Sequence, residues 1–165
     1  MNIEKLKAAV KGAVIPVYDP SFKASTEALL WNGRKQSAQP QLIVKASCIP
    51  DVIATVRFAA EAGLRVSPRG GGHNFSGIAQ QDGIVLDLGA LNRIWIDKSA
   101  RVAEVGPAAT NADLASALEA QGLAFPVGHC ASVPMSGYLL GGGFGWNSGS
   151  WGYGFSNVES IDVVL

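Results

Sequence analysis

Glycine is concentrated in the second part of this chain, and its distribution limits what the chain can fold into more than any other feature. Seventeen of the twenty glycines lie at or beyond Gly70. Three stand together at 70–72, after residues that favour a strand, and four lie within 141–145. Glycine permits positive φ and lets backbone approach another molecule with no side chain between them. The two clusters therefore predict places where main chain meets a ligand or a neighbouring segment.

The sequence around these clusters predicts short strands and helices. Apolar runs bounded by turn-forming residues predict strands at 41–45, 64–67, 83–88, 93–97 and 101–105. The last three are expected to be neighbours in one sheet. A helix is predicted at 50–62, with a buried face formed by Val52, Val56 and Ala59. A second is predicted at 110–121, where Thr110 and Asp113 are close to a capping box and the buried face is marked by Leu114 and Leu118.

The leading segment, residues 1–39, gives weaker signals. We expect a helical start, a turn around 18–20 and an otherwise irregular path to Pro40, with little functional content. The chain contains no internal repeat and no linker-like stretch. It is therefore expected to form one α+β unit, or two lobes that meet near residue 70 or 90.

Charge and hydropathy narrow the choice of partners and location. Thirteen basic residues balance thirteen acidic ones, so no net field attracts nucleic acid or an anionic membrane. No apolar run approaches the roughly 20 residues of a spanning helix, and the charged start lacks a signal-peptide core. We therefore expect no nucleic-acid partner, no membrane partner and a cytoplasmic location.

The loop 68–74 has a composition typical of loops that bind anions through backbone N–H groups. Glycines directly after a strand allow backbone N–H groups to converge on a pyrophosphate, although a flexible turn is the common alternative for such a triplet. Neither glycine cluster matches GxGxxG, and GxxxxGK[ST] is absent, so Rossmann and P-loop sites are excluded by spacing. A dinucleotide site of another design remains.

Histidine and cysteine are scarce, which directs attention to the few that occur. The two histidines are His73, at the end of the first glycine loop, and His129, directly before Cys130; Cys48 is the other cysteine. His73 could be a nucleophile, a base, a ligand or a structural residue. A metal site of His73, His129 and Cys130 lacks a further ligand nearby, so no metal is predicted. The following aromatic residues are interpreted mainly as core, with covering a flat ring as the alternative: Phe144, Trp146, Trp151, Tyr153 and Phe155.

Two sequence strings resemble the flavin-attachment motifs of berberine-bridge-enzyme-like oxidases, within the vanillyl-alcohol oxidase and p-cresol methylhydroxylase (PCMH) superfamily. They are PRGGGHNFSG at 68–77 and GHCASVPMSGYLLGGGFGW at 128–146. The resemblance covers roughly residues 40–165, including 84–88, 105–108 and 158–165. Asn74 and Met135 depart from the residues common in this family, at positions where backbone contacts tolerate the change.

The resemblance implies FAD as the cofactor, bound covalently. In the family, a histidine at the position of His73 bonds the flavin 8α-methyl carbon, and a cysteine at the position of Cys130 bonds flavin C6. The thiolate would form near positive potential, for which N–H groups of the adjacent helix start are candidates. The remaining cofactor-binding residues implied are Pro68, Arg69, Gly70, Gly71, Gly72, Asn74, Gly77, Ser136, Gly137, Gly141 and Gly142.

The resemblance also implies a fold and an activity. The fold would be an α+β, PCMH-type FAD-binding domain of two small α/β lobes with mixed sheets, incomplete over residues 40–165 and without the substrate domain. The activity would be that of an oxidase or dehydrogenase taking hydride from a C–H bond of an alcohol, sugar or related small molecule, with O2 or another acceptor. The catalytic base is expected outside this chain.

Three alternatives stay open. The chain could be a truncated flavin-binding fragment without turnover, or its FAD could be bound through one covalent bond or none. Exposed apolar surface could also let copies associate into a homo-oligomer.

Overall fold

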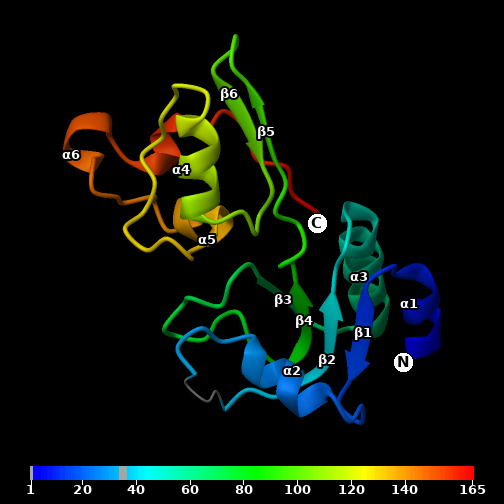
Figure 1. Cartoon of the computed structure of the whole chain (residues 1–165). Helices are drawn as coiled ribbons and strands as arrows, with labels where there is room; N and C mark the ends of the chain where they lie inside the picture. Colours follow the sequence, from blue (N-terminus) through cyan, green and yellow to red (C-terminus); the bar gives the residue numbers. More distant parts are fainter. Residues whose placement is uncertain (1, 34–36) are drawn as a thin grey trace. The chain divides into compact units, whose positions relative to one another are not determined.

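A computed structural model describes residues 2–33 and 37–165, and it divides the chain between Ala90 and Leu91. The first unit comprises residues 1–90 with 163–165, and the second comprises residues 91–162. Figure 1 draws the first mainly in blue to green and the second in green to red. Of the two positions expected for a boundary between lobes, residue 90 is the one observed. Residues 34–36 of the leading segment lie outside the described residues.

The first unit contains a mixed four-stranded sheet. Its strands lie in the order β1 (Ala13–Pro16), β2 (Pro40–Lys45), β4 (Gly83–Asp87), β3 (Val66–Arg69). β1 pairs antiparallel with β2, whereas β4 is parallel to both β2 and β3. α3 (Ile49–Ala62) connects β2 to β3, and β4 later inserts between them. This order places the end of β3, which leads into the first glycine loop, at an edge of the sheet.

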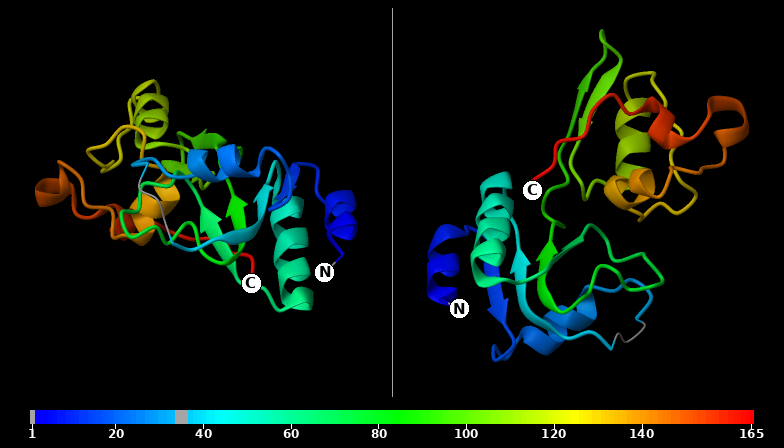
Figure 2. Two further views of the ribbon diagram at one scale, coloured as in Figure 1. Left: turned by 90° about the horizontal axis from the view of Figure 1, so that it is seen from below. Right: turned by 180° about the vertical axis from the view of Figure 1, so that it is seen from behind.

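Helices cover both faces of this sheet, as Figures 1 and 2 show. α1 (Ile3–Ala9) and α3 pack on the face formed by Leu42, Val44 and the alternate residues of β4. α2 (Phe22–Ala28) packs with Ile43 and Val85, whose side chains point to the opposite face. Because both faces are covered, the central strands read as continuous apolar runs rather than alternating ones.

The buried face of α3 agrees with the prediction at Ala59 and differs from it elsewhere. The buried residues are Asp51, Thr55, Phe58 and Ala59, whereas Val52 and Val56 are only half-buried. The helix is rotated toward Asp51 because that carboxylate accepts hydrogen bonds from the N–H groups of Lys11, Gly12 and Ser47 at 2.8–3.0 Å. The buried carboxylate of Asp51 therefore lies on the face of α3 that an apolar pattern would assign to valine.

The second unit is built on a hairpin and short helices. β5 (Ile94–Asp97) and β6 (Val102–Val105) pair antiparallel. They are followed by α4 (Asn111–Glu119), α5 (Met135–Leu140), α6 (Ser148–Trp151) and the 3-10 helix η1 (Gly154–Asn157). Leu114, Leu118 and Met135 form the core, against half-buried residues of the hairpin. The predicted capping box is confirmed: Asp113 N–H donates to Thr110 Oγ1 and Thr110 N–H to Asp113 Oδ2.

Two further predictions need correction. The segment 83–88 was expected beside 93–97, but β4 pairs with β2 and β3 in the first unit, and β5 pairs only with β6. β1 and α2 were not anticipated in the leading segment, because short elements carry little periodicity. Both complete the sheet layers of the first unit. Of the helices that the structure describes, none combines the length and apolar character needed to cross a membrane.

Candidate functional site

The first glycine loop leaves β3 and is held by the segment that follows α2. Pro68 and Arg69 are the last residues of β3, and Gly70, Gly71 and Gly72 follow. Gly72 has φ +70°, and a Cβ there would lie 1.9 Å from the carbonyl oxygen of Leu29. Trp31 N–H donates to the Gly72 carbonyl at 3.2 Å. Only glycine fits at position 72, and the reason is packing within the protein.

Arg69 supports the same loop. Its Nε donates to the Leu29 carbonyl at 3.0 Å, and one terminal nitrogen lies 3.2 Å from Asp87 Oδ1. The two side chains are 17 and 14 % exposed, so this ion pair is largely shielded from solvent. Asp87 Oδ1 also accepts from Gly89 N–H at 3.1 Å. The guanidinium thus ties β3, β4 and the end of α2 together beneath the loop.

His73 follows the loop and is half-buried. Its imidazole stacks on the indole of Trp31, with ring centroids 4.6 Å apart and planes inclined by 24°. The chain then turns, because Asn74 Oδ1 accepts from Ser76 N–H at 2.9 Å and Gly77 has φ +69°. Trp31 and Leu29 precede the motif from which the site was predicted, and the sequence carried no signal that they contact it.

Cys130 lies in a loop of the second unit, residues 128–133. Cys130 and His129 are both exposed. Cys130 Sγ lies 3.5 Å from Ser132 Oγ. The His129 ring is tilted against Trp146, with centroids 4.0 Å apart, and lies 6.2 Å from Phe144. The thiol is therefore accessible, with a hydroxyl group at its side.

The helix start after Cys130 does not offer the expected donors to the thiol. Met135 N–H donates to the Ala109 carbonyl at 2.8 Å, and Ser136 N–H donates to the Pro107 carbonyl at 3.3 Å. These two N–H groups join α5 to the chain before α4. These two N–H groups therefore do not donate to the thiol, and a contribution of the helix start to the potential at Cys130 stays a prediction.

The second glycine cluster has an open part and a packed part. A Cβ at Gly137 or Gly142 would meet nothing within 4 Å, while Gly141 ends α5. A Cβ at Gly143 would lie 2.7 Å from Gly154 Cα, and one at Gly145 would lie 2.1 Å from the Val127 carbonyl. Glycine at 143 and 145 thus serves packing, which the sequence did not indicate. Backbone at Gly137 and Gly142 is left uncovered by other protein atoms.

The aromatic residues after this cluster are not core residues. Phe144 is 65 % exposed and Trp146 is 79 % exposed, and the other three are about half exposed: Trp151, Tyr153 and Phe155. Phe144 and Tyr153, and Tyr153 and Phe155, contact each other with centroids 6.0 Å apart. The interpretation of these side chains as core is therefore wrong, and they form an accessible aromatic surface on the second unit.

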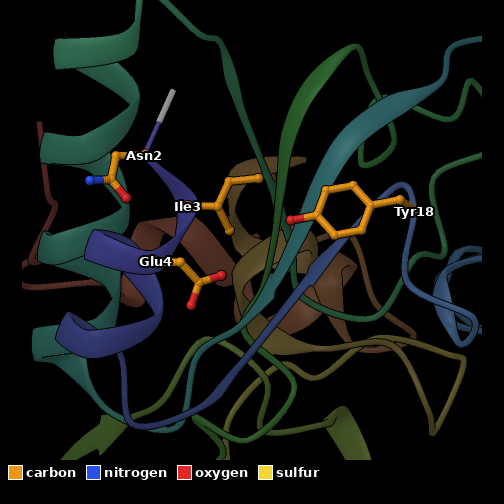
Figure 3. A pocket seen from close by; sticks show the side chains of 4 residues that line it. All are labelled: Asn2, Ile3, Glu4 and Tyr18. Atoms are coloured by element: carbon orange, nitrogen blue, oxygen red, sulfur yellow. The ribbon is translucent and has the colours of Figure 1, made fainter.

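Two surface depressions lie away from the predicted site. A depression of about 540 Å³ is lined by Asn2, Ile3, Glu4 and Tyr18, where Tyr18 faces the start of α1 (Figure 3). Another, of about 390 Å³, lies beside the turn at Gly122 and Trp151. Neither is lined by glycines 70–72 or 141–145, by His73 or by Cys130. Among residues 2–33 and 37–165, no three His, Cys, Asp or Glu side chains gather as metal ligands.

The residues present fit FAD. A bulky dinucleotide needs backbone that it can approach closely, and Gly137 and Gly142 border open space. A covalent bond needs an accessible nucleophile, and Cys130 is exposed while His73 is half-buried at the end of its loop.

A comparison with protein families shows what kind of domain the chain contains. The FAD binding domain family matches residues 40–165. The chain belongs to this FAD-binding domain family. The resemblance drawn from the two motifs is therefore confirmed, and the α+β fold with a mixed sheet is the fold of a PCMH-type FAD-binding domain, present in part.

Relatives of this FAD-binding domain are named oxidases. The chain is 36% identical over 157 residues to (R)-6-hydroxynicotine oxidase of Paenarthrobacter nicotinovorans. This match covers 94% of the chain and 34% of that protein. It is 34% identical over 161 residues to the xylooligosaccharide oxidase of Thermothelomyces thermophilus, covering 94% and 32%. The chain thus spans about a third of the length of the curated relatives it matches.

Solved structures show the same fold. The 6-hydroxy-D-nicotine oxidase from Arthrobacter nicotinovorans matches with a TM-score of 0.78 and 37% identity, over 87% of this chain and 31% of that one. The BBE-like 1 protein of Physcomitrella patens matches with a TM-score of 0.83 at 22% identity, over 96% and 34%. The second likeness concerns the fold alone.

Proposed function

We propose that this chain is the FAD-binding part of an oxidase or dehydrogenase whose flavin is bonded to His73 and to Cys130. The observation that carries the proposal is the placement of these two residues: each lies in or beside a glycine loop, and neither is enclosed by the protein. When bound, the flavin supplies the hydride-accepting ring for a C–H bond of an alcohol, sugar or related donor, and O2 or another acceptor reoxidises it.

The chain's own residues would hold and orient the cofactor. Arg69 and Trp31 fix the loop before and at His73, so the imidazole enters the reaction from a restrained position. Gly137 and Gly142 leave room at the backbone of the second unit. The other residues proposed to line the cofactor lie at the end of β3 and in the loop after it, or in α5 and at its end: Pro68, Gly70, Gly71, Asn74, Gly77, Ser136 and Gly141.

The two covalent bonds have defined stoichiometry. Bonding His73 to the 8α carbon removes one hydrogen from the methyl group and one from the imidazole; bonding Cys130 to C6 removes one hydrogen from the ring and one from the thiol. Each bond is thus a two-electron oxidation. Oxidised flavin could itself take up the two electrons of one bond, and O2, by becoming H2O2, would reoxidise it before the second. Protein expressed without O2 is therefore expected to carry fewer doubly bonded flavins.

The test is a spectrum and an intact mass of the full gene product, including any sequence after residue 165, before and after acid denaturation. Yellow colour that stays with the denatured chain, with FAD mass on peptides containing His73 and Cys130, supports two bonds. Cys130→Ala separates two covalent bonds from one or none. A flavin bonded at both residues would lose one bond in this variant and change its spectrum, whereas a flavin bonded only to His73, or not bonded, would keep its attachment and its spectrum. A colourless chain with unmodified peptides would refute covalent binding.

A second candidate is a flavin-binding chain without turnover of its own, favoured by the coverage of only about a third of its relatives' length. Both candidates predict bound flavin. They differ in whether the full gene product, with any sequence after residue 165, reduces its flavin when mixed with alcohol, sugar or amine donors under exclusion of oxygen. Bleaching of the yellow colour favours the enzyme, and unchanged colour favours the fragment.

A further inference from the structure

Asn111, the first residue of α4, connects that helix to the loop that carries Cys130. Its side chain is 2 % exposed. Its Oδ1 accepts from Gly128 N–H at 2.8 Å, and its Nδ2 donates to the carbonyls of Cys130 at 3.3 Å and Val133 at 3.0 Å. A carboxamide has two N–H donors, and both are used here. One buried side chain thus holds the main chain before, at and after the thiol-bearing residue.

Backbone N–H groups at the start of α4 also donate hydrogen bonds to this loop. Asn111 N–H donates to the Val133 carbonyl at 2.9 Å, and Ala112 N–H donates to the Ala131 carbonyl at 3.0 Å. The absence of a side chain at Gly128 permits the close approach, because a Cβ there would lie 3.0 Å from Asn111 Nδ2. The loop 128–133 is therefore tied to α4 along its length, while the side chains of His129 and Cys130 stay exposed.

We propose that Asn111 is a positioning residue for Cys130: by fixing the main chain on both sides, it presents Sγ in one place for bonding to the flavin. The inference rests on the proposed bond at Cys130. An apolar residue at position 111 would remove the acceptor of the Gly128 N–H and one donor each from the carbonyls of Cys130 and Val133. These carbonyls would keep only their backbone donors, the N–H groups of Val133 and of residue 111, so the loop would be held less firmly. Asn111→Asp keeps the acceptor for Gly128 but turns an oxygen toward two carbonyls.

A merely structural role in α4 makes a different prediction, and Thr110 provides the matched control. Thr110 Oγ1 caps the same helix at the adjacent position by accepting from Asp113 N–H at 3.1 Å. Thr110→Ala weakens α4 without removing any of the three side-chain hydrogen bonds from Asn111 to the loop. The four proteins to compare are the wild type, Asn111→Ala, Asn111→Asp and Thr110→Ala, each as the full gene product.

The readout is the fraction of peptide bonded to flavin at each attachment residue after acid denaturation. The two Asn111 variants are expected to keep wild-type occupancy at His73 and to lose about tenfold or more at Cys130, the factor that follows from losing two or three part-buried hydrogen bonds. Thr110→Ala is expected to keep both bonds. Equal losses at Cys130 in Asn111→Ala and Thr110→Ala, or an equal loss at His73, would overturn the inference.

Hydrogen exchange separates this inference from the proposed function. Amides of 128–133 are expected to exchange about tenfold faster in Asn111→Ala and not in Thr110→Ala, with or without flavin. If wild-type Cys130 carries no flavin, the two-bond function fails, and exchange alone then decides the role of Asn111. Faster exchange confined to the Asn111 variant supports the positioning of the loop, and unchanged exchange overturns it.

Discussion

The indole of Trp31 stacks on the imidazole of His73, with ring centroids 4.6 Å apart and planes inclined by 24°. Trp31 is 56 % exposed, so the contact adds little to the core and acts mainly on the orientation of the imidazole. An aromatic pair of this kind contributes about 0.5–1.5 kcal/mol. Trp31→Ala is therefore expected to lower the fraction of His73 bonded to flavin by about two- to tenfold.

The same measurement distinguishes stacking from a general surface effect. Trp31→Phe keeps a ring against His73 and is expected to keep most of the bonded flavin. Trp95, which is 50 % exposed on β5, is a matched control, and Trp95→Ala should leave occupancy at His73 unchanged. If both alanine variants lower occupancy equally, stacking on His73 is not the cause.

Gly72 and Gly63 form a natural pair for measuring the contact beneath the first glycine loop. Both have positive φ, +70° and +66°, but a Cβ at Gly72 would meet the Leu29 carbonyl at 1.9 Å, whereas one at Gly63 would meet nothing within 4 Å. Gly63→Ala should cost about 1 kcal/mol of unfolding free energy, from backbone conformation alone. Gly72→Ala should cost about 3 kcal/mol or more. Urea denaturation measures both, and similar losses would contradict the packing role of Gly72.

Asp51 should make the stability of the first unit dependent on acid pH. Burial would raise the pKa of this carboxyl, but hydrogen bonds from Ser47 and Lys11 outweigh it and hold the pKa well below its usual range. A depressed folded pKa means that the stabilisation is complete above the unfolded value of about 3.9 and is lost as the pH falls below it.

Asp51→Asn tests this directly. The variant loses the charge that accepts from Lys11, Gly12 and Ser47, and we expect it to cost about 2–4 kcal/mol at neutral pH. Its stability should also fall less steeply than the wild type's between about pH 4 and pH 2. Asp19→Asn, at an exposed turn of the same unit, is the control and should change little. Parallel pH profiles for the wild type and Asp51→Asn would refute the assignment.

The part of the fold that could be predicted is the part with continuous local signals. The strand 41–45, the helices 50–62 and 110–121 and the capping box at Thr110 carry their own patterns, and the structure has them. The order of the strands in the sheet could not be predicted from the sequence. β4 pairs with β2 and β3, which lie far from it in the sequence, and strand pairing depends on packing rather than on local residues.

The candidate site also has residues that the sequence predicts and residues that it does not. Glycine clusters and the scarce His and Cys are visible in the sequence, so His73 and Cys130 could be nominated. Their supports could not, because Leu29 acts through a carbonyl that every residue has, and Asn111 and Trp31 contact the loops only through the tertiary fold. The exposure of the aromatics after Gly143 was also unreadable, since apolar composition alone favours burial.

Tyr138 joins the two loops of the second unit, and its hydroxyl yields the last prediction. The hydroxyl lies within hydrogen-bonding distance of the Pro126 carbonyl and, at 2.8 Å, of the Gly143 carbonyl, so one O–H is shared between the segment before Gly128 and the glycine cluster. Tyr138→Phe should cost about 1–2 kcal/mol of unfolding free energy. Tyr153→Phe, at a tyrosine 49 % exposed, should cost much less.

The pH dependence of Tyr138 gives an independent check. Burial raises the pKa of this phenol, because it disfavours the charged form. A raised folded pKa means that stability is complete below the unfolded value of about 10 and declines as the pH rises through and beyond it. Tyr138→Phe has no phenol at this position and therefore lacks this decline. Since the wild type starts out more stable and loses stability above about pH 10, the difference between variant and wild type should shrink there. A difference that stays constant up to the alkaline unfolding of the protein would show that the hydroxyl is not buried between the two carbonyls.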